Sequence, residues 1–364
     1  MKIGEITQTL AEFAPPAFRE SYDNIGLLVG NAQLACTGVL CTLDVTGAVI
    51  QEAIERRCNL VVTHHPVIFK GLQKITGSND SERAIILAIQ KNIAIYAIHT
   101  NIDNVLHGVN GILARKLGLI KTQVLLPKAN TLCKLHTFAP TAYAEKIKNA
   151  LFEAGAGKIG AYSECSFSTS GTGTFKAGAE THPFVGTIGQ RHLEAEEKIE
   201  VIFPAVLQQG IVAALLQAHP YEEVAYDIVP LLNTFHQVGS GITGQMPHPT
   251  EETAFLEKLK HELKAPVIKH TRLLGKPIQK VAICGGAGSF LIRQAIASGA
   301  DIFITADVKY HEFFEVNDAL ILADVGHWES EQFTIELLEA VLQTKFPTFA
   351  VLKSKVSTNP IHYF

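Results

Sequence analysis

Short apolar runs alternate along the chain with stretches in which apolar residues recur at helical spacing. Residues 39–43 and 59–63 form two such runs, and residues 49–54 between them place Val, Ile and Ala on one helical face. Residues 281–307 show the same order of apolar run, helical stretch and apolar run. Runs of this length without polar alternation are typical of strands buried on both faces. The pattern therefore predicts an α/β fold that contains two β-α-β units.

The two β-α-β units align with each other without a gap. Val39 corresponds to Val281 and Ile54 to Ile296, so each pair is 242 positions apart (281 − 39). Chance rarely preserves register over a whole unit of this kind. We therefore expect two copies of one α/β module that together form a single outer domain.

Residues 131–236 separate the two copies and follow a different pattern. The predicted elements are, in order, strand 132–138, helix 141–154, strand 161–168, strand 199–203, helix 206–218 and strand 224–229. This βαββαβ order predicts a ferredoxin-like domain inserted into a discontinuous outer domain of residues 1–130 and 237–364. The Gly-, Ser- and Thr-rich residues 168–174 are expected to form a mobile loop.

Polar side chains gather where four predicted strands of the outer domain end. In open α/β sheets, ligands bind beyond the carboxyl ends of the strands. These ends therefore predict a functional site. They carry His64 and His65, His99 with Asp103, Asp307 with His311, and His327 with Glu331.

Each member of this set also has a structural alternative. Two adjacent histidines commonly mark a strand end or a buried position. The alternative for Asp103 is the role of a helix N-cap before Val105. His327 and Glu331 lie four residues apart at the predicted start of a helix, which puts both on one face. An acid at that position would also suit the helix dipole. Only the conjunction of several strand ends favours a site.

Three imidazoles and two carboxylates make a mixed nitrogen and oxygen ligand set. His64, His65, Asp103, His327 and Glu331 suit Zn²⁺, Mn²⁺, Fe²⁺ or Co²⁺. Five protein ligands are more than one catalytic metal usually takes. Two divalent cations bridged by a carboxylate fit the set better.

Three further residues near the strand ends are candidates for catalysis. His99, Lys309 and His311 could exchange a proton or hold a substrate anion, but the sequence does not assign the acid or base role to any of them. The glycine-rich residues 284–289 match no phosphate-binding motif in full and favour a plain tight turn. The segment 23–26 likewise favours a turn that opens a strand.

Composition limits the classes of protein to consider. With 364 residues, 47% hydrophobic and 18% charged, the chain has ample material for buried cores, which excludes a disordered protein. A net charge of −4 does not indicate nucleic acid as a partner, and the 15 histidines fit the metal hypothesis. Six cysteines without a C-x-x-C pair, no leader pattern and no long apolar segment predict a soluble cytoplasmic protein that does not associate with membranes.

The chain resembles the GTP cyclohydrolase 1 type 2 homologue family, also called Nif-three-like proteins. The resemblance covers about residues 1–128 and 238–364, and the insert, with residues 219–223, resembles the PII-like or CutA-like trimerising domain of the longer bacterial members. The motifs that carry it are Asp23-Asn24-Ile25-Gly26-Leu27, Val62-Thr63-His64-His65-Pro66, His99-Thr100-Asn101-Ile102-Asp103 and Gly326-His327-Trp328-Glu329-Ser330-Glu331.

The resemblance implies a dinuclear metal centre on the five predicted ligands and a toroidal homohexamer built from two trimers. It implies ring opening of GTP only weakly. The first hypothesis is therefore a metal-dependent hydrolase that acts on a nucleotide or a related small substrate. A metal-dependent phosphoesterase is a related hypothesis. The alternative is an oligomeric metal-binding protein with a regulatory or assembly role, in which the insert senses a ligand or only holds the oligomer together.

Overall fold

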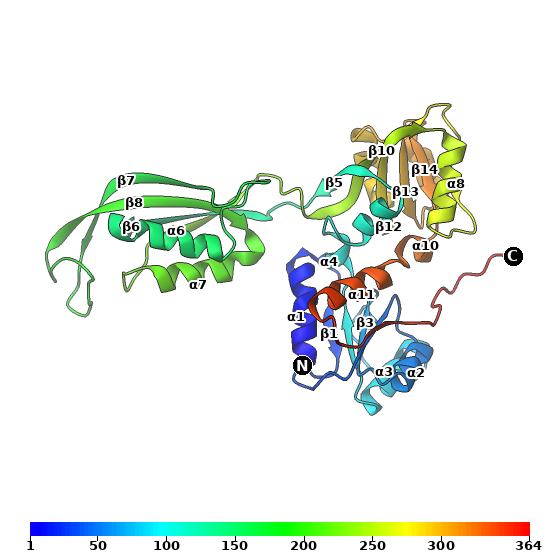
Figure 1. Cartoon of the computed structure of the whole chain (residues 1–364), viewed down its shortest axis with the longest axis horizontal. Helices are drawn as coiled ribbons and strands as arrows, with labels where there is room; N and C mark the ends of the chain where they lie inside the picture. The colour runs from blue at the N-terminus through cyan, green and yellow to red at the C-terminus, as the bar shows by residue number, and fades with distance from the viewer. The chain divides into compact units, whose positions relative to one another are not determined.

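The computed structural model describes residues 1–364. Its internal contacts divide the chain into two compact units (Figure 1). The first unit comprises Met1–Pro127 and His236–Phe364, and the second comprises Lys128–Phe235. No helix is long and apolar enough to cross a membrane. The predicted α/β class is confirmed.

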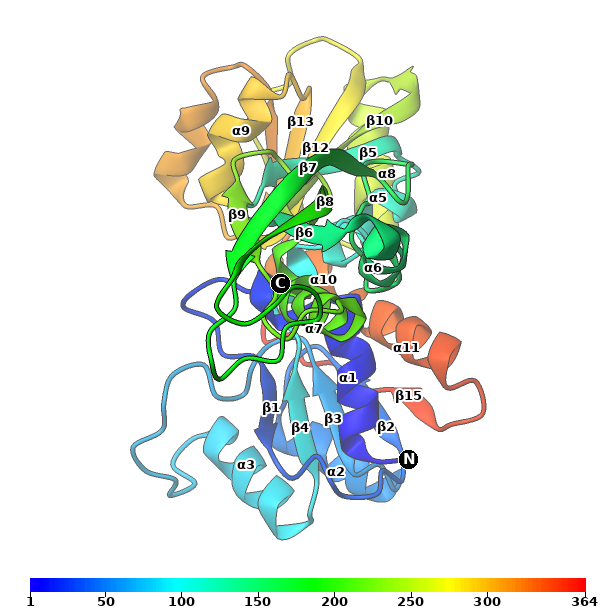
Figure 2. The same ribbon diagram turned by 90° about the vertical axis from the view of Figure 1, so that its left-hand side faces the viewer.

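One sheet of the first unit has the strand order β1-β4-β3-β2-β15 (Figure 2). Its strands β2, β3, β4 and β15 are parallel, and β1 is antiparallel to β4. Every residue of β2, β3 and β4 is buried, which explains their unbroken apolar sequence. The strands are β1 (Gly26–Val29), β2 (Val39–Thr42), β3 (Leu60–Thr63), β4 (Ala94–Ala97) and β15 (Val351–Lys353).

Helices cover both faces of this sheet. On one face, alternate strand residues pack with α2 and α3; on the other, the intervening residues pack with α1 and α11. Thr46 caps α2 and Asn79 caps α3, each accepting a backbone N–H with its side-chain oxygen. The helices are α1 (Ile3–Phe13), α2 (Gly47–Glu55), α3 (Asp80–Gln90) and α11 (Thr334–Lys345), and the 3₁₀ helix η1 (Pro16–Phe18) follows α1.

The other sheet of the first unit has the strand order β11-β14-β13-β12-β10-β5. Strands β12, β13 and β14 are parallel, whereas β10 is antiparallel to both of its neighbours. The strands are β5 (Ile120–Pro127), β10 (Gly239–Thr250), β11 (Lys269–His270), β12 (Ile278–Ala287), β13 (Ile302–Ala306) and β14 (Ile321–Asp324). The remaining helices of the unit are α4 (Thr100–Asp103), α5 (Val109–Lys116), α8 (Glu252–Glu262), η4 (Ser289–Leu291), α9 (Ile292–Ala297), η5 (Tyr310–Val316) and α10 (His327–Glu331).

The two sheets of the first unit share one hydrophobic cluster and repeat one strand register. Val39 lies opposite Leu60 across β2 and β3, and Val281 lies opposite Ile302 across β12 and β13. Each position in the second pair is 242 residues after its counterpart in the first (281 − 39 and 302 − 60). One apolar cluster joins inward residues of both sheets.

The second unit has the element order β-α-β-β-α-β and one sheet in the order β7-β8-β6-β9, with every neighbouring pair antiparallel. Helices α6 and α7 lie on the same side of this sheet (Figure 1), where both pack against its apolar residues in a separate core. The elements are β6 (Leu132–Pro140), η2 (Thr141–Tyr143), α6 (Ala144–Glu153), β7 (Ser166–Lys176), β8 (Arg191–Pro204), η3 (Ala205–Leu207), α7 (Gln208–Ala218) and β9 (Tyr226–Leu231).

Two sequence predictions about secondary structure are wrong. Residues 168–174 form part of β7 and not a mobile loop, because Ser168 to Thr174 pair in continuous register with β8. This strand is largely exposed, so it lacks the apolar alternation that would have marked it. The single helix expected from His327 onward is two helices, α10 and α11, which are interrupted at residues 332–333.

Candidate metal centre

His64 and His65 follow directly after β3. Their backbone N–H groups still donate to Thr42 and Leu43 at the end of β2, so both residues are fixed by the sheet. The His64 side chain is fully buried, and its Nδ1–H donates to the carbonyl of Ile98 at 3.0 Å. Because a carbonyl only accepts, Nδ1 carries the proton and Nε2 is left without a hydrogen-bond partner. His64 therefore presents a bare, buried nitrogen.

The other two predicted histidine ligands are oriented by carboxylates. His65 Nδ1 lies 2.7 Å from Asp44 Oδ1, and His327 Nδ1 lies 2.7 Å from Asp307 Oδ2. Both Nε2 atoms consequently face inward and approach each other to 3.3 Å. A histidine that binds a metal through one nitrogen characteristically donates its other N–H to a carboxylate or carbonyl. This arrangement is therefore typical of histidines that bind a metal.

Glu331 is the point on which these imidazoles converge. Its side chain is only 3% exposed and comes from α10, one helical turn after His327. Its Oε2 lies 2.9 Å from His65 Nε2, 3.1 Å from His327 Nε2 and 3.7 Å from His64 Nε2. Residues that are 262 positions apart in the chain thus meet at one carboxylate oxygen.

Asp103 completes the predicted ligand set. Its Oδ1 lies 3.7 Å from His64 Nε2 and is buried without a hydrogen-bond partner. Asp103 is the last residue of α4, and Gly108 is the N-cap of α5, so the alternative that Asp103 caps a helix is wrong. All five predicted ligands therefore lie in one cluster.

His99 lies beside this cluster. Its ring centroid is 5.2 Å from that of His64 and 5.4 Å from that of His65. Its Nδ1 is held by Asp23 Oδ1 at 2.8 Å, and Asp23 Oδ2 also accepts the backbone N–H of Thr100. Burial alone would raise the pKa of Asp23, but the hydrogen bonds from His99 and Thr100 lower it to about 2. The segment that the sequence indicated only as a turn therefore orients a candidate catalytic residue.

Lys309 and His311 do not join the cluster. Both side chains are exposed at the start of η5, and neither forms a hydrogen bond or ion pair with the five predicted ligands. The His311 ring contacts Tyr310 and Phe314. Asp307, which precedes them, holds His327 instead.

Opposed pKa shifts describe the charges in the cluster. Burial lowers the pKa of His64 to about 4 and leaves it neutral. Burial also acts to lower the pKa values of His65 and His327, but hydrogen bonds to carboxylates raise them to about 10 and about 9. Burial and the charge of Glu331 raise the pKa of Asp103, whereas the imidazoles hold that of Glu331 well below its ordinary value against the effect of burial. The extra protons on His65 and His327 thus compensate the negative charge of the buried Glu331 carboxylate, as bound cations would.

Two residues that orient the site were missed by the sequence analysis. Asp44 lies in the loop between β2 and α2, and its Oδ2 accepts a 2.5 Å hydrogen bond from Thr358 Oγ1 in the C-terminal segment. Asp44 stands at the carboxyl end of a repeated strand, and this position was a usable signal. Thr358 lies in a segment without periodicity and gave none.

The donor set fits divalent cations. Two buried atoms, His64 Nε2 and Asp103 Oδ1, have no hydrogen-bond partner, although such atoms are usually satisfied in folded proteins. The possible ligand atoms lie within 4.8 Å of one another in each of two overlapping groups, His64-His65-His99 and His65-His327-Glu331. The cluster could therefore hold metal ions through mixed nitrogen and oxygen ligands.

Asp44→Asn should weaken cation binding without unfolding the chain. An amide is a poorer acceptor for the His65 N–H, so the imidazole loses both orientation and basicity. We expect the affinity for Mn²⁺ or Zn²⁺ to fall about 10–100-fold, measured by calorimetric titration. Asp80→Asn, on the exposed start of α3, is the matched control. Equal affinities for the two variants would contradict the role of Asp44.

Comparisons with known proteins bear on the identity of the chain. A model of the Duf34/NIF3 (NGG1p interacting factor 3) family matches residues 1–360. The protein called GTP cyclohydrolase 1 type 2 homolog from Bacillus subtilis is 35% identical over 368 residues, covering 99% of this chain and 98% of its own. That from Halalkalibacterium halodurans is 37% identical over 363 residues, covering 98% of each. The crystal structure of a Bacillus cereus protein related to NIF3 matches with a TM-score of 0.88 at 35% identity, covering 100% of this chain and 99% of that one. These matches confirm the resemblance found in the sequence, and the chain belongs to the Duf34/NIF3 family.

Proposed function

We propose that this protein is a hydrolase that depends on two divalent cations and acts on a nucleotide or a related small substrate. The observation that carries the proposal is the convergence of three imidazoles, each with its Nδ1 held by an acceptor, on the buried carboxylate of Glu331. Separate hydrogen bonds to other groups of the fold could satisfy these side chains at a lower cost in free energy than the burial of several charged groups in one place. Their arrangement therefore favours a site that takes up cations.

His64, His65, Asp103, His327 and Glu331 would hold the cations, with Glu331 as the shared ligand because its Oε2 faces all three imidazoles. The candidate ions are Zn²⁺, Mn²⁺, Fe²⁺ and Co²⁺. Such cations supply Lewis-acid charge and activate water for attack on carbon or phosphorus.

His99 is the candidate for moving a proton. Asp23 fixes its Nδ1–H, which leaves Nε2 as the atom that can accept or donate beside His64 and His65. A carboxylate that fixes the tautomer of an imidazole in this way is a common feature of catalytic bases. Lys309 and His311, both exposed on η5, remain candidates for holding a substrate anion.

An exposed aromatic pair next to His99 supports a flat substrate. Phe69 is 45% exposed and lies 6.4 Å from His99 between ring centroids, and Tyr22, 66% exposed, lies 6.4 Å from Phe69. The side chain of Asn24 donates to the carbonyl of Ile68 and so fixes the loop that carries Phe69. Exposed aromatic rings stack favourably on nucleobases. GTP, named in the descriptions of the relatives, is the first substrate to test, and a phosphoester is the second.

The architecture supports a wider proposal about assembly. We infer that the two β-α-β halves of the first unit are copies of one module, because a single offset relates their strand registers. The element and strand order of the second unit supports a ferredoxin-like domain, and the sequence resemblance implies that it is of the PII or CutA kind. Such a domain would join subunits into trimers, two of which would form a toroidal homohexamer. The alternative function is a metal-binding assembly or regulatory protein without turnover.

A measurement of substrate turnover distinguishes a hydrolase from a metal-binding assembly or regulatory protein. The chain reconstituted with Mn²⁺, Zn²⁺, Fe²⁺ or Co²⁺ should convert GTP or one member of a phosphoester panel, as followed by chromatography of the products. Glu331→Gln should lose at least about a hundredfold in rate, because an amide cannot serve as the shared anionic ligand. Phe69→Ala should raise KM at least about fivefold and leave metal content unchanged. Rates no higher than those of Glu331→Gln on every substrate would refute the enzymatic function.

Binding of the cations should release protons. Carboxylates raise the pKa values of His65 and His327 to about 10 and about 9, so both imidazoles carry an extra proton near pH 7 that a cation must displace. Affinity should therefore rise with pH from about 7 to about 9. Calorimetric titrations at pH 7 in buffers of different ionisation enthalpy should show at least one proton released per chain. A heat that is independent of the buffer would contradict this coupling.

A further inference from the structure

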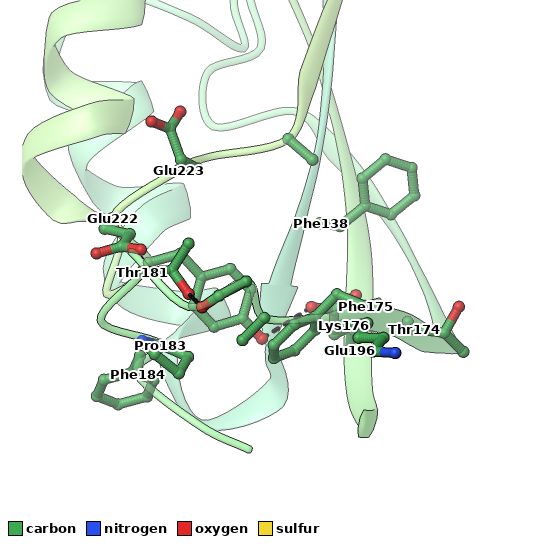
Figure 3. Close-up of a pocket in the computed structure, with 15 residues that line it drawn as sticks. Phe138, Thr174, Phe175, Lys176, Thr181, Pro183, Phe184, Glu196, Glu222 and Glu223 are labelled. Atoms are coloured by element: carbon green, nitrogen blue, oxygen red, sulfur yellow. Dashed lines mark hydrogen bonds between the residues drawn. The ribbon is translucent and has the colours of Figure 1, made fainter. Parts of the chain in front are cut away.

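The second unit contains a pocket of about 450 Å³ that the proposed function does not use. Its lining comes from the end of β7 and the loop that follows it, from residues 221–225 before β9, and from Phe138 of β6 and Glu196 of β8 (Figure 3). All these residues belong to the second unit. The volume falls within the range of small-molecule sites, which are typically about 300–1,000 Å³ and combine apolar walls with a few convergent polar groups.

The motif His219-Pro220-Tyr221-Glu222-Glu223 holds one side of the pocket in place. His219 is 7% exposed, and its Nε2–H donates to the carbonyl of Phe138 at 2.9 Å. Its Nδ1 accepts the backbone N–H of Tyr221 at 3.1 Å. A neutral imidazole thus ties the motif to the end of β6. Burial lowers the pKa of His219 and favours this neutral form.

Tyr221 and Glu196 meet inside the pocket. The Tyr221 hydroxyl donates to Glu196 Oε1 at 2.9 Å. The carboxylate of Glu196 lies against Gly173 of β7, where a Cβ atom would collide with its Oε2. Glycine in this exposed strand therefore provides the space that the carboxylate occupies.

Glu222 fixes the opposite side of the pocket. Its two carboxylate oxygens lie 3.0 and 3.1 Å from the backbone N of His182 and accept that N–H. This contact anchors the loop that carries Phe184, whose ring lies 6.2 Å from that of Tyr221. Neither contact is needed to build the sheet, because the core of the unit lies on its helical face. Both serve to shape the pocket.

The lining combines aromatic rings with negative charge. Phe175 and Phe184 flank Tyr221 at centroid distances of 6.4 and 6.2 Å. Three carboxylates, Glu196 among them, line the pocket together with one ammonium group, that of Lys176. Aromatic faces attract cations through their quadrupoles, and an excess of carboxylates attracts cations and repels anions.

We propose that this pocket binds a small organic cation, a flat amidine or guanidine, with its planar group against the aromatic rings of Phe175 and Tyr221 and its charge on Glu196. A carboxylate matches the paired N–H donors of such a group. The excess of carboxylates in the lining disfavours phosphates and carboxylic acids. The second unit would then sense a ligand through residues that the metal cluster does not contain.

Benzamidine, benzamide and benzoate test this proposal, because they have nearly the same shape and differ in charge. The full chain should bind benzamidine saturably in calorimetric or ligand-observed NMR titration, and the neutral and anionic analogues at least about tenfold more weakly. Glu196→Gln should weaken benzamidine binding at least about tenfold, because glutamine still accepts from Tyr221 but carries no charge. Phe175→Leu should weaken it roughly threefold and provides a second variant if Glu196→Gln does not fold.

Glu197→Gln is the matched control. Glu197 is adjacent to Glu196 in β8, so its side chain points to the other face of the sheet and does not line the pocket. This variant should bind benzamidine like the original chain. The proposal is overturned if benzamidine does not bind, if benzoate binds as tightly, or if Glu197→Gln loses as much affinity as Glu196→Gln.

Discussion

The first unit depends on one buried carboxylate. Glu331 is 3% exposed, yet its Oε2 lies within 3.7 Å of the Nε2 atoms of three histidines. Removing a carboxylate from water costs several kcal/mol, which only nearby positive charge and hydrogen bonds can offset. His64 and His65 come from the end of β3 in one sheet, and His327 follows β14 in the other. The electrostatic balance of Glu331 therefore requires both sheets to be placed correctly.

The backbone conformation at the end of β12 leaves space for the carboxylate of Glu331. Gly286, at the end of β12, has a φ of +63°, and a Cβ atom there would collide with the Glu331 side chain. Its N–H donates to Ser330 Oγ at 2.9 Å, which holds this end of β12 against α10. The sequence favoured a plain tight turn for the glycine-rich segment 284–289, and this prediction is wrong for residues 284–287, which still belong to β12. Only glycine combines this backbone conformation with such a close approach.

Sequence reasoning identified the histidines and acids of the cluster because they follow apolar runs whose type is unambiguous. His64, Asp103, His327 and Glu331 stand after such strands or at the start of the next helix, and the α/β class itself followed from the same runs. Asp44 was missed although its position just after β2 was a usable signal, because its contact with His65 is visible only in the fold. Thr358 was missed because its segment has no pattern. Strand β7 was mistaken for a loop because its exposed Ser, Thr and Gly residues carry no burial signal. In each case the missing information was a tertiary contact.

The central claim is that Glu331 is shared by two divalent cations, and anomalous scattering tests it most directly. Crystals of the chain grown with Mn²⁺ or Zn²⁺, measured above and below the absorption edge of the ion, should show two anomalous peaks per chain. Both peaks should lie within coordination distance, about 2.0–2.3 Å, of the carboxylate and imidazole atoms described above. A single peak, or peaks away from Glu331, would contradict the account.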